Sequence, residues 1–249
     1  MIAVTGASGL VGSILAGALD GDVRLLDIKP KPGVEALDLR DLAAVERAFE
    51  GAEKVVHLGA ISSEASFEDI LDHNIKTTYN VYEAARRQGV RRVVFASSNH
   101  AIGMYPRSQK IGPDVPVRPD TYYGVSKAFG EALGRLYSEK WGLEVACIRI
   151  GTVNAEDKPL TARHLSTWLS HRDAVGLIRA CLDAPLNFQI VYGVSKTSRA
   201  WWDMRAAEAL GYSPQDNADD YADEVGPDPS EPLGRQGGQF VAPDFTGDA

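Results

Sequence analysis

The sequence predicts an α/β protein in which a doubly wound parallel sheet is followed by a smaller C-terminal part. Two observations carry this prediction. Apolar strands alternate with amphipathic helices as far as residue 150, which is typical of a parallel sheet with helices on both faces. The opening strand, residues 2–5, runs directly into Gly6, Gly9 and Gly12, and a helix is expected at residues 13–19.

Glycines at this spacing permit a tight turn, a close approach of the backbone to a pyrophosphate, and close packing of the helix on the strand. The helix then points its positive end at the phosphates. A GxxGxxG pattern alone is weak evidence, but here it lies between a strand and a helix, as the motif requires. The first 150 residues are therefore predicted to form a Rossmann-like dinucleotide-binding part.

The second strand, residues 23–27, ends in Asp27, about 15 residues after Gly12. A carboxylate at this place can bind the hydroxyls of the adenosine ribose, and it favours NAD over NADP because it repels a 2′-phosphate. The alternative is a solvated aspartate at the end of a strand. Lys29 lies close by in the sequence and, as a cation, would tolerate the 2′-phosphate.

The other elements of this part follow in order. We expect strands at residues 34–37, 54–58, 92–96 and 144–150, and helices at 41–49, 68–88 and 122–140. Two accounts of Asp38 and Leu39 are open: they contact the adenine of the cofactor, or they form the N-cap of the helix that starts before Leu42. His57 is expected to pack in the core, and the small residues 59–63 leave room for a cofactor. The expected apolar face of helix 68–88 is Ile70, Leu71, Ile75, Val81, Tyr82 and Ala85.

Beyond Gly151 the pattern loosens. A helix is expected at residues 172–182, a strand at 188–192 and another helix at 201–210. From Asp216 onward the chain is rich in Asp, Pro and Gly, so we expect a flexible end or an arm laid over a neighbour. We find no internal repeat, and we predict a single domain, 1–249. Residues 1–150 would mainly bind the dinucleotide, and residues 151–249 would form the substrate-binding part and the C-terminal arm.

The composition excludes some partners. The formal net charge of −8 argues against nucleic acid and against an anionic membrane surface. Cys147 and Cys181 lie in apolar stretches without the spacing of metal ligands, so we expect buried free thiols in a reducing cytosol. No apolar run reaches transmembrane length, and the first strand lacks the basic start of a signal peptide. A cytoplasmic protein without a metal is predicted.

Tyr123 and Lys127 are the main candidates for chemistry. Four residues apart on a helix, they lie on one face, and an ammonium beside a phenol lowers its pKa from about 10 toward neutral. Tyr123 is then a candidate general base. Ser98 follows the fifth strand, and ligands lie beyond the carboxyl ends of parallel strands, so these three residues are expected to meet. The alternative is a chance pair on an exposed helix, which the N-terminal glycines disfavour.

Gly6, Gly9, Gly12, Asp27, Ser98, Tyr123 and Lys127 together resemble the extended short-chain dehydrogenase/reductase family. Asn74 matches an Asn of that family, whereas Thr77 stands where many members have Gly. Within the family, the sequence is similar to the bacterial uronate dehydrogenases. The segments that carry this likeness are residues 96–103, 112–116, 123–127, 165–168, 191–193, 201–203 and 236–238, of which SSNHAIG and STW are the most specific. Residues 153–162 depart from the expected pattern.

The resemblance implies that NAD oxidises a hexuronic acid, D-glucuronate or D-galacturonate, at C1 to an aldarolactone. Tyr123 would be the base, Ser98 would hydrogen-bond the same oxygen, and Lys127 would bind the nicotinamide ribose. The substrate-binding residues implied are Ser62, Ser98, Asn99, His100, Tyr123, Thr152 and Arg163. The cofactor-binding residues are Gly6, Ser8, Gly9, Leu10, Val11, Gly12, Asp27, Ile28, Asp38, Leu39, Leu58, Gly59, Ala60, Tyr123, Lys127 and Ile150.

Alternatives remain for single residues and for the whole protein. Asn99 and His100 could merely cap the end of a strand, and Arg163 could be a solvated loop residue, whereas Arg149 lies inside an apolar strand and is expected to be structural. A nucleotide-sugar epimerase or dehydratase would share the cofactor site and the Tyr/Lys pair. A non-catalytic NAD sensor would typically have lost the Tyr or the Lys. A homo-oligomer is expected.

Overall fold

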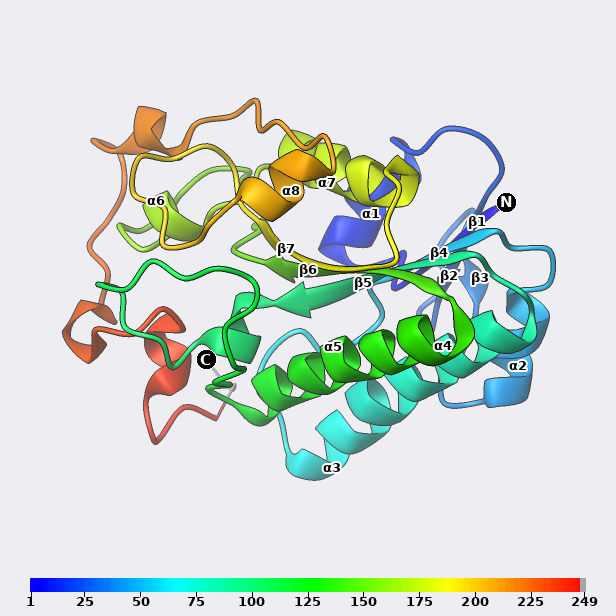
Figure 1. Ribbon diagram of the computed structural model, residues 1–249. Coiled ribbons are helices and arrows are strands. Elements are labelled where there is room, and N and C mark those ends of the chain that lie inside the picture. The colour runs from blue at the N-terminus through cyan, green and yellow to red at the C-terminus, as the bar shows by residue number, and fades with distance from the viewer. Residues whose placement is uncertain (247–249) are drawn as a thin grey trace.

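The computed structural model describes residues 1–246, and their centre is a seven-stranded sheet (Figure 1). All neighbouring strands pair in parallel, in the order β3-β2-β1-β4-β5-β6-β7. The doubly wound parallel sheet predicted from the sequence is therefore confirmed. The strands are β1 (Ile2–Thr5), β2 (Val23–Asp27), β3 (Glu35–Ala36), β4 (Lys54–His57), β5 (Arg92–Ser98), β6 (Glu144–Ile150) and β7 (Phe188–Gly193).

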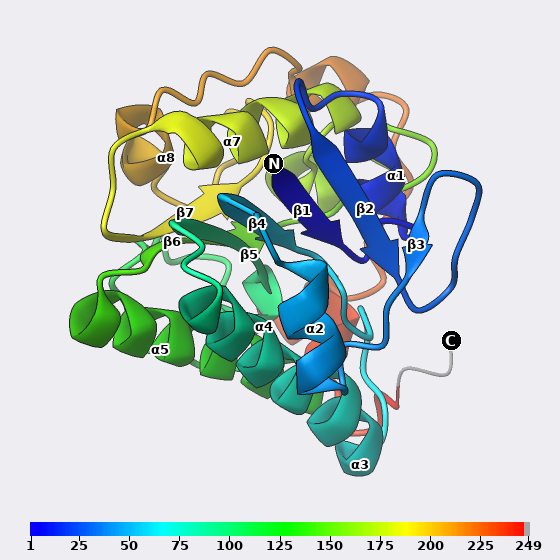
Figure 2. The ribbon, with the colours of Figure 1, turned by 90° about the vertical axis from the view of Figure 1, so that its right-hand side faces the viewer.

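Helices cover both faces of the sheet (Figure 2). One face carries α2 (Leu42–Ala48), α4 (Lys76–Arg87) and α5 (Tyr122–Trp141), and the other carries α1 (Leu10–Ala16), α7 (His171–Asp183) and α8 (Arg205–Ala209). A separate apolar core lies under each layer, with Phe49 and Val81 in the first and Leu15 and Leu177 in the second. None of the helices within residues 1–246 combines the length and the apolar character that crossing a bilayer requires.

The order of the strands reverses beside β1. The chain runs from β1 outward to β2 and β3, and then returns to place β4 on the other side of β1. A crevice opens at such a switch point, beyond the carboxyl ends of the strands. The candidate residues after β1, β4, β5 and β6 therefore lie at one edge of the sheet.

Several expected elements have different bounds in the structure. The first helix begins at Leu10 instead of Ser13, the third strand has two residues, and the helix expected at 201–210 is limited to α8. The N-cap of α2 is Asp41, whose carboxylate accepts from the Ala44 N–H at 3.1 Å, so the N-cap alternative for Asp38 is wrong. His57 is buried as expected, and burial lowers its pKa to about 3.

The helix expected at residues 68–88 consists of three segments. These are α3 (Phe67–Ile70), a π-helical segment (Leu71–Ile75) and α4. A π-helical turn contains one residue more than an α-helical turn, so it rotates the residues before it relative to those after it. Ile70, Val81 and Ala85 are buried as expected, but Leu71 is 42% exposed, so its assignment to the apolar face is wrong.

Residues 216–246, the C-terminal arm, fold back over this same chain (Figure 1). The Gln236 N–H donates to the Tyr105 carbonyl and the Gly237 N–H donates to the Gly103 carbonyl, both at 2.9 Å. Gln236 is completely buried. The segment is an arm laid over its own chain, and its contact with a neighbouring subunit stays a prediction. Besides Asn99–Ile102 after β5, the 3₁₀ turns are Ala218–Tyr221, Glu231–Leu233 and Gly238–Val241, all three in the arm.

Candidate active site

The glycine-rich turn after β1 brings three backbone segments into close contact. Gly6 has a φ of +73°, and a Cβ atom there would lie 2.6 Å from the Gly59 nitrogen. A Cβ atom on Gly12 would lie 2.3 Å from the Gly6 carbonyl oxygen. Any larger residue would therefore displace backbone at both positions. The turn leaves its own backbone accessible at the edge of the sheet, which is what close approach of a pyrophosphate requires.

Asp27 lies next to this turn and is held by backbone amides. Its two carboxylate oxygens accept from the Ser8 N–H at 2.9 Å and from the Lys29 N–H at 2.8 Å. The Ser8 hydroxyl donates to the Lys29 carbonyl at 2.6 Å, and the Lys31 ammonium donates to the Ser8 carbonyl at 2.7 Å. This arrangement fixes the carboxylate at the end of β2, where it faces the cleft described next.

A cleft of about 970 Å³ runs along the carboxyl edge of the sheet. Of the cofactor-binding residues predicted from the sequence, all but Ser8 line it. Asp38 is held in a bidentate pair by Arg40, whose hydrogen bond lowers the pKa of that carboxyl to about 2. The lining also includes residues outside the predicted cofactor-binding set, among them Lys29, Ile61, Asp69, His73, Thr77 and Val153.

The three predicted catalytic residues meet at one end of this cleft. Ser98, the last residue of β5, lines it together with Tyr123 and Lys127 from the first turns of α5. The Lys127 ammonium donates to the Ala96 carbonyl at 2.8 Å and lies 5.4 Å from the centre of the Tyr123 ring. The chance-pair alternative required an exposed helix face, and it is wrong because both side chains are buried.

Local contacts fix the start of α5. The Thr121 hydroxyl caps the helix by accepting from the Gly124 N–H at 3.0 Å. The Glu64 carboxylate accepts from the N–H groups of Tyr122 and Tyr123 at 3.2 and 2.9 Å. A carboxylate is stabilised at a helix N-terminus by the helix dipole. Glu64, on the loop after β4, thereby ties that loop to the helix that carries Tyr123.

The electrostatics of Tyr123 differ from the expectation. Burial raises the pKa of Tyr123 to about 12, and a hydrogen bond with Ser98 only partly opposes this. Burial also lowers the pKa of Lys127 to about 8. Removing water from around the phenol disfavours the phenolate, and the negative charge of Asp120 adds to this effect. The expected pKa near neutral for Tyr123 by itself is therefore wrong, and the two groups must be treated as one coupled set.

Asn99, Thr152 and Arg163 form a cluster beside the catalytic residues. With the amide orientation that satisfies both of its ends, Asn99 accepts from Arg163 Nη2 at 2.9 Å and donates to the Ile150 carbonyl at 3.2 Å. Arg163 Nη1 donates to the Thr152 hydroxyl at 3.4 Å, and its Nε and Nη2 donate to the Gln236 carbonyl at 3.2 and 2.8 Å. The structure thus brings these three predicted residues together.

Arg163 has no carboxylate partner among residues 1–246. Burial and, second, the charge of Arg107 lower its pKa to about 10, so the guanidinium stays charged at neutral pH. Arg149 is the opposite case. It forms two hydrogen bonds of 2.8 Å with the buried Glu131 carboxylate, as the structural role expected for it requires. A half-buried guanidinium that is held only by neutral oxygens is suited to receive an anionic group.

The two remaining predicted residues are Ser62, on the loop after β4, and His100, which contacts Tyr123. Ser62 lines the cleft, and the Asn74 side chain holds the preceding residue by accepting from the Ile61 N–H at 2.8 Å and donating to its carbonyl at 3.0 Å. His100 packs edge-on against Tyr123, with 5.8 Å between ring centres. Asn99, His100, Thr152 and Arg163 lie beyond the residues that line the described cleft.

Sequence reasoning missed several supporting residues. Glu64 holds the start of α5, Asp120 contacts His100, and Gln236 holds Arg163 through its backbone while its side chain bonds Trp202, Pro106 and Gln109. Gln236 belongs to residues 236–238, one of the segments that carry the family resemblance, and this resemblance could have indicated a role for it. Glu64 and Asp120 lie in loops, where no periodicity marks them.

The fold and the site together define a dinucleotide-binding protein with a Ser-Tyr-Lys set at the end of its cleft. Residues 2–178 match the model of the NAD dependent epimerase/dehydratase family, and the chain belongs to this family. The family resemblance drawn from the sequence is therefore confirmed.

Individual relatives cover nearly the whole chain. Uronate dehydrogenase from Agrobacterium fabrum is 46% identical over 96% of this chain and 95% of its own. A crystal structure of a mutant uronate dehydrogenase from Agrobacterium tumefaciens, complexed with NAD, is 45% identical, covers 98% of both chains and has a TM-score of 0.91. Glucuronic acid dehydrogenase from Chromohalobacter salexigens is 42% identical, covers 100% of this chain and 98% of its own, and also has a TM-score of 0.91.

Proposed function

We propose that the protein is an NAD-dependent dehydrogenase that oxidises the cyclic form of a hexuronic acid, D-glucuronate or D-galacturonate, at C1 and releases the aldarolactone. One observation carries the choice of an acidic sugar. Arg163 lies beside the catalytic residues, held by neutral oxygens and without a carboxylate partner in the described part of the chain. The similarity to uronate dehydrogenases supports the same substrate class.

The residues that line the cleft fit NAD. The glycine-rich turn, Gly6 to Gly12, leaves backbone accessible for the pyrophosphate, and Asp27 would bind the adenosine ribose. Lys127 would bind the nicotinamide ribose. Bound nicotinamide supplies the acceptor for the hydride that leaves C1.

The side chains of this chain then orient the sugar and move one proton. Ser98 hydrogen-bonds the anomeric oxygen, and Tyr123 takes the proton of the anomeric hydroxyl while the C1 hydrogen leaves as hydride. Arg163, with Asn99 and Thr152 beside it, would bind the C6 carboxylate through its planar fork. Ser62 and His100 would contact other hydroxyls. The net change is the loss of one hydride from C1 and one proton from its oxygen.

Absorbance of NADH during turnover tests this function. We would compare glucuronate with glucose and galacturonate with galactose, because each pair differs at C6 by a carboxylate. We expect a much higher kcat/KM for each uronate than for its neutral partner. Turnover of the neutral sugars at equal kcat/KM would contradict the role of Arg163. Conversion of a nucleotide sugar without net NADH would instead identify the epimerase alternative, and tight NAD binding without turnover of any sugar would identify an NAD sensor.

Three broader expectations remain as proposals. Residues 1–150 would mainly bind the dinucleotide, and residues 151–249 would mainly form the substrate-binding part. A homo-oligomer is supported by large apolar side chains exposed on α4 and α5, Tyr79, Leu136 and Trp141, and light scattering of the purified protein would test it. A cytoplasmic location is supported by the free thiols of Cys147 and Cys181, both buried.

A further inference from the structure

Asp120 is a buried carboxylate that the proposed mechanism does not use. It precedes Thr121, the N-cap of α5, and its side chain has no exposed surface. Removing a carboxylate from water is costly unless hydrogen bonds replace the water. Asp120 Oδ2 lies 2.8 Å from His100 Nδ1, and Oδ1 accepts from the Thr121 hydroxyl at 3.0 Å. The imidazole is therefore one of the two side-chain partners of this carboxylate within residues 1–246.

Three glycines from different parts of the chain make room for this carboxylate. A Cβ atom on Gly103 would lie 1.7 Å from Asp120 Oδ2, and one on Gly237, in the C-terminal arm, would lie 2.0 Å from the same oxygen. A Cβ atom on Gly124 would lie 3.1 Å from Oδ1. The segment after β5, the first turn of α5 and the arm thus converge on one side chain. A side chain at Gly103 or Gly237 would therefore displace the carboxylate.

The ring of His100 is held on its other sides by aromatic contacts. Phe240 of the arm stacks on it with 3.9 Å between ring centres, and Tyr123 meets it edge-on. Nδ1 contacts Asp120, whereas Nε2 has no hydrogen-bond partner among residues 1–246. The imidazole side chain keeps 11% of its surface exposed. The ring is held in place, Nδ1 is hydrogen-bonded, and Nε2 is free to hydrogen-bond a ligand.

A carboxylate can only accept hydrogen bonds, so the Nδ1 that faces it must carry a proton. In a neutral imidazole, protonation of one nitrogen leaves the other as an acceptor. We propose that Asp120 is a positioning residue that holds His100 as the Nδ1–H tautomer, with Nε2 as an acceptor for one hydroxyl of the sugar beside C1. This proposal rests on the proposed function, and it specifies the direction of the hydrogen bond, from the substrate hydroxyl to Nε2.

Asp120→Asn is the informative variant, because the amide has the same shape and fits between the glycines. It removes the charge that orders the imidazole, and its NH₂ group can donate to Nδ1 and so select the other tautomer. We expect KM for glucuronate to rise about five- to 150-fold, the effect of leaving one buried polar group without its hydrogen-bond partner, about 1–3 kcal/mol. KM for NAD should stay within about twofold of wild type.

A double-mutant cycle separates positioning from a general structural role. If Asp120 acts through His100, adding Asp120→Asn to His100→Ala should change kcat/KM by less than about twofold. If Asp120→Asn lowers kcat/KM by the same factor in the wild type and in His100→Ala, the proposal is overturned. The matched control is Thr121→Val, which removes the other partner of the same carboxylate. It should lower the melting temperature through loss of the helix cap, and it should leave the KM for glucuronate near the wild-type value.

The tautomer itself can be measured without turnover. Nitrogen-15 NMR of histidine-labelled protein distinguishes a protonated from an unprotonated ring nitrogen, and comparison with His100→Ala assigns the signals. We expect Nδ1–H and a bare Nε2 in the wild type, and a shift toward Nε2–H in Asp120→Asn. A wild-type protein with Nε2 protonated would overturn the proposal even if Asp120→Asn does not fold. If uronates are not substrates but the tautomer is as expected, the function fails and the positioning role stands.

Discussion

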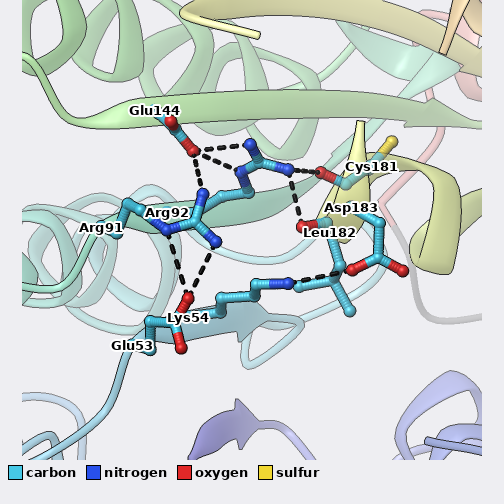
Figure 3. A network of polar contacts seen from close by, with 8 residues as sticks. All are labelled: Glu53, Lys54, Arg91, Arg92, Glu144, Cys181, Leu182 and Asp183. Carbon is cyan, nitrogen blue, oxygen red and sulfur yellow. Dashed lines mark hydrogen bonds and ion pairs between the residues drawn. The ribbon is translucent and has the colours of Figure 1, made fainter. Parts of the chain in front are cut away.

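The charged groups at the amino edge of the sheet have different partners from three charged groups of the site at the carboxyl edge. At the amino edge, β5 and β6 begin with Arg92 and Glu144, which pair with each other, and β4 begins with Lys54, which pairs with Asp183 at the end of α7 (Figure 3). The Arg91 guanidinium bonds Glu53 at 2.9 Å and Glu144 at 2.7 Å, and Arg92 bonds Glu144 at 2.6 Å. Arg92 also donates to the carbonyls of Cys181 and Leu182 at the end of α7. The charges of this network are neutralised within the fold.

At the carboxyl edge, three charged groups have neutral partners instead. Asp27 is held by two backbone N–H groups, Lys127 by the Ala96 carbonyl, and Arg163 by the Gln236 carbonyl and the Thr152 hydroxyl. Within residues 1–246 none of the three forms an ion pair. Neutral partners orient a charge without cancelling it, so its field remains available to a ligand. The comparison separates charge used for stability from charge used for binding, and substitutions at each edge should have different consequences.

Tyr123→Phe should have the largest effect at the carboxyl edge. We expect kcat to fall about 10²- to 10⁴-fold, because the general base is lost, while the dissociation constant of NAD changes little. The control is Tyr122→Phe on the same helical turn, whose side chain is 52% exposed and should not affect the rate. Turnover of Tyr123→Phe within a few-fold of wild type would refute the role of base.

Asp27 should make the enzyme prefer NAD over NADP. Its carboxylate would face a 2′-phosphate, and a like-charge contact costs several kcal/mol, so the ratio of kcat/KM values should be about a hundredfold or more. Asp27→Asn should reduce this ratio by raising kcat/KM for NADP. The control is Lys29→Met, which should lower kcat/KM for NADP only slightly. Equal use of both cofactors by the wild type would mean that Lys29 outweighs Asp27.

Arg163→Met should raise KM for glucuronate about ten- to hundredfold and leave KM for NAD nearly unchanged, because one charge-assisted contact is lost. Arg163→Lys should recover only part of this, since an ammonium keeps the charge but loses the planar fork. Arg149→Met is the matched contrast. It breaks a buried pair with Glu131 and should cost about 3–5 kcal/mol of stability, a loss that Arg163→Met should not show. Unaltered glucuronate kinetics in Arg163→Met would remove this residue from the site.

The rate should depend on pH through the coupled pair of Tyr123 and Lys127. The base must be unprotonated to accept a proton from the sugar. The pair of Tyr123 and Lys127 shares its protons, so the form with a phenolate and an ammonium exists only after the pair has lost one proton. The pair loses this first proton near the lower of its two pKa values, about 8 for Lys127. kcat/KM for the uronate should therefore fall about tenfold for each pH unit below about 8 and level off above it. The dissociation constant of NAD, measured over the same range, is the control. A flat profile between about pH 6 and 8 would contradict this assignment.

Arg92→Met, at the amino edge, should have the smallest effect on catalysis. Arg92 is 2% exposed, so its loss leaves two buried carbonyls without their partner and removes one of the two arginines that pair with Glu144. It should cost about 3 kcal/mol of stability. Thermal unfolding would measure this loss, while kcat/KM should stay at the wild-type value. Arg91→Met is the control, because an exposed arginine contributes about 0–1 kcal/mol through the same carboxylate. A large loss of activity in folded Arg92→Met would contradict the claim that charges at the amino edge serve stability and not binding.

The features that were predicted best from the sequence are those that depend on residues close to one another in the chain. The glycines after β1, the acid at the end of β2 and the Tyr/Lys spacing on α5 each depend on a few neighbouring residues, and the structure places all of them at one cleft. Helix bounds were less accurate. Leu71 was assigned to the buried face because the π-helical turn that rotates this face leaves no mark in the hydrophobic pattern.

The predicted substrate-binding residues depend on contacts between segments that lie far apart in the sequence. Arg163 and Gln236 are 73 residues apart, and Asn74 and Ser126 are 52 apart. Only the family resemblance indicated Arg163, and nothing in the sequence indicated Asp120, whose importance follows from three glycines that surround it in space. The pKa of Tyr123 was also beyond sequence reasoning, because it depends on how completely the fold excludes water.

The fold of the arm back over the site has a consequence for biosynthesis. Gln236 leaves the ribosome 73 residues after Arg163. The whole sheet has emerged by then, so a nascent chain can assemble its dinucleotide cleft before the carbonyl that orients Arg163 and the glycine that encloses Asp120 exist. During synthesis, the residues that line the dinucleotide cleft are therefore complete before those that finish the surroundings of Arg163 and Asp120.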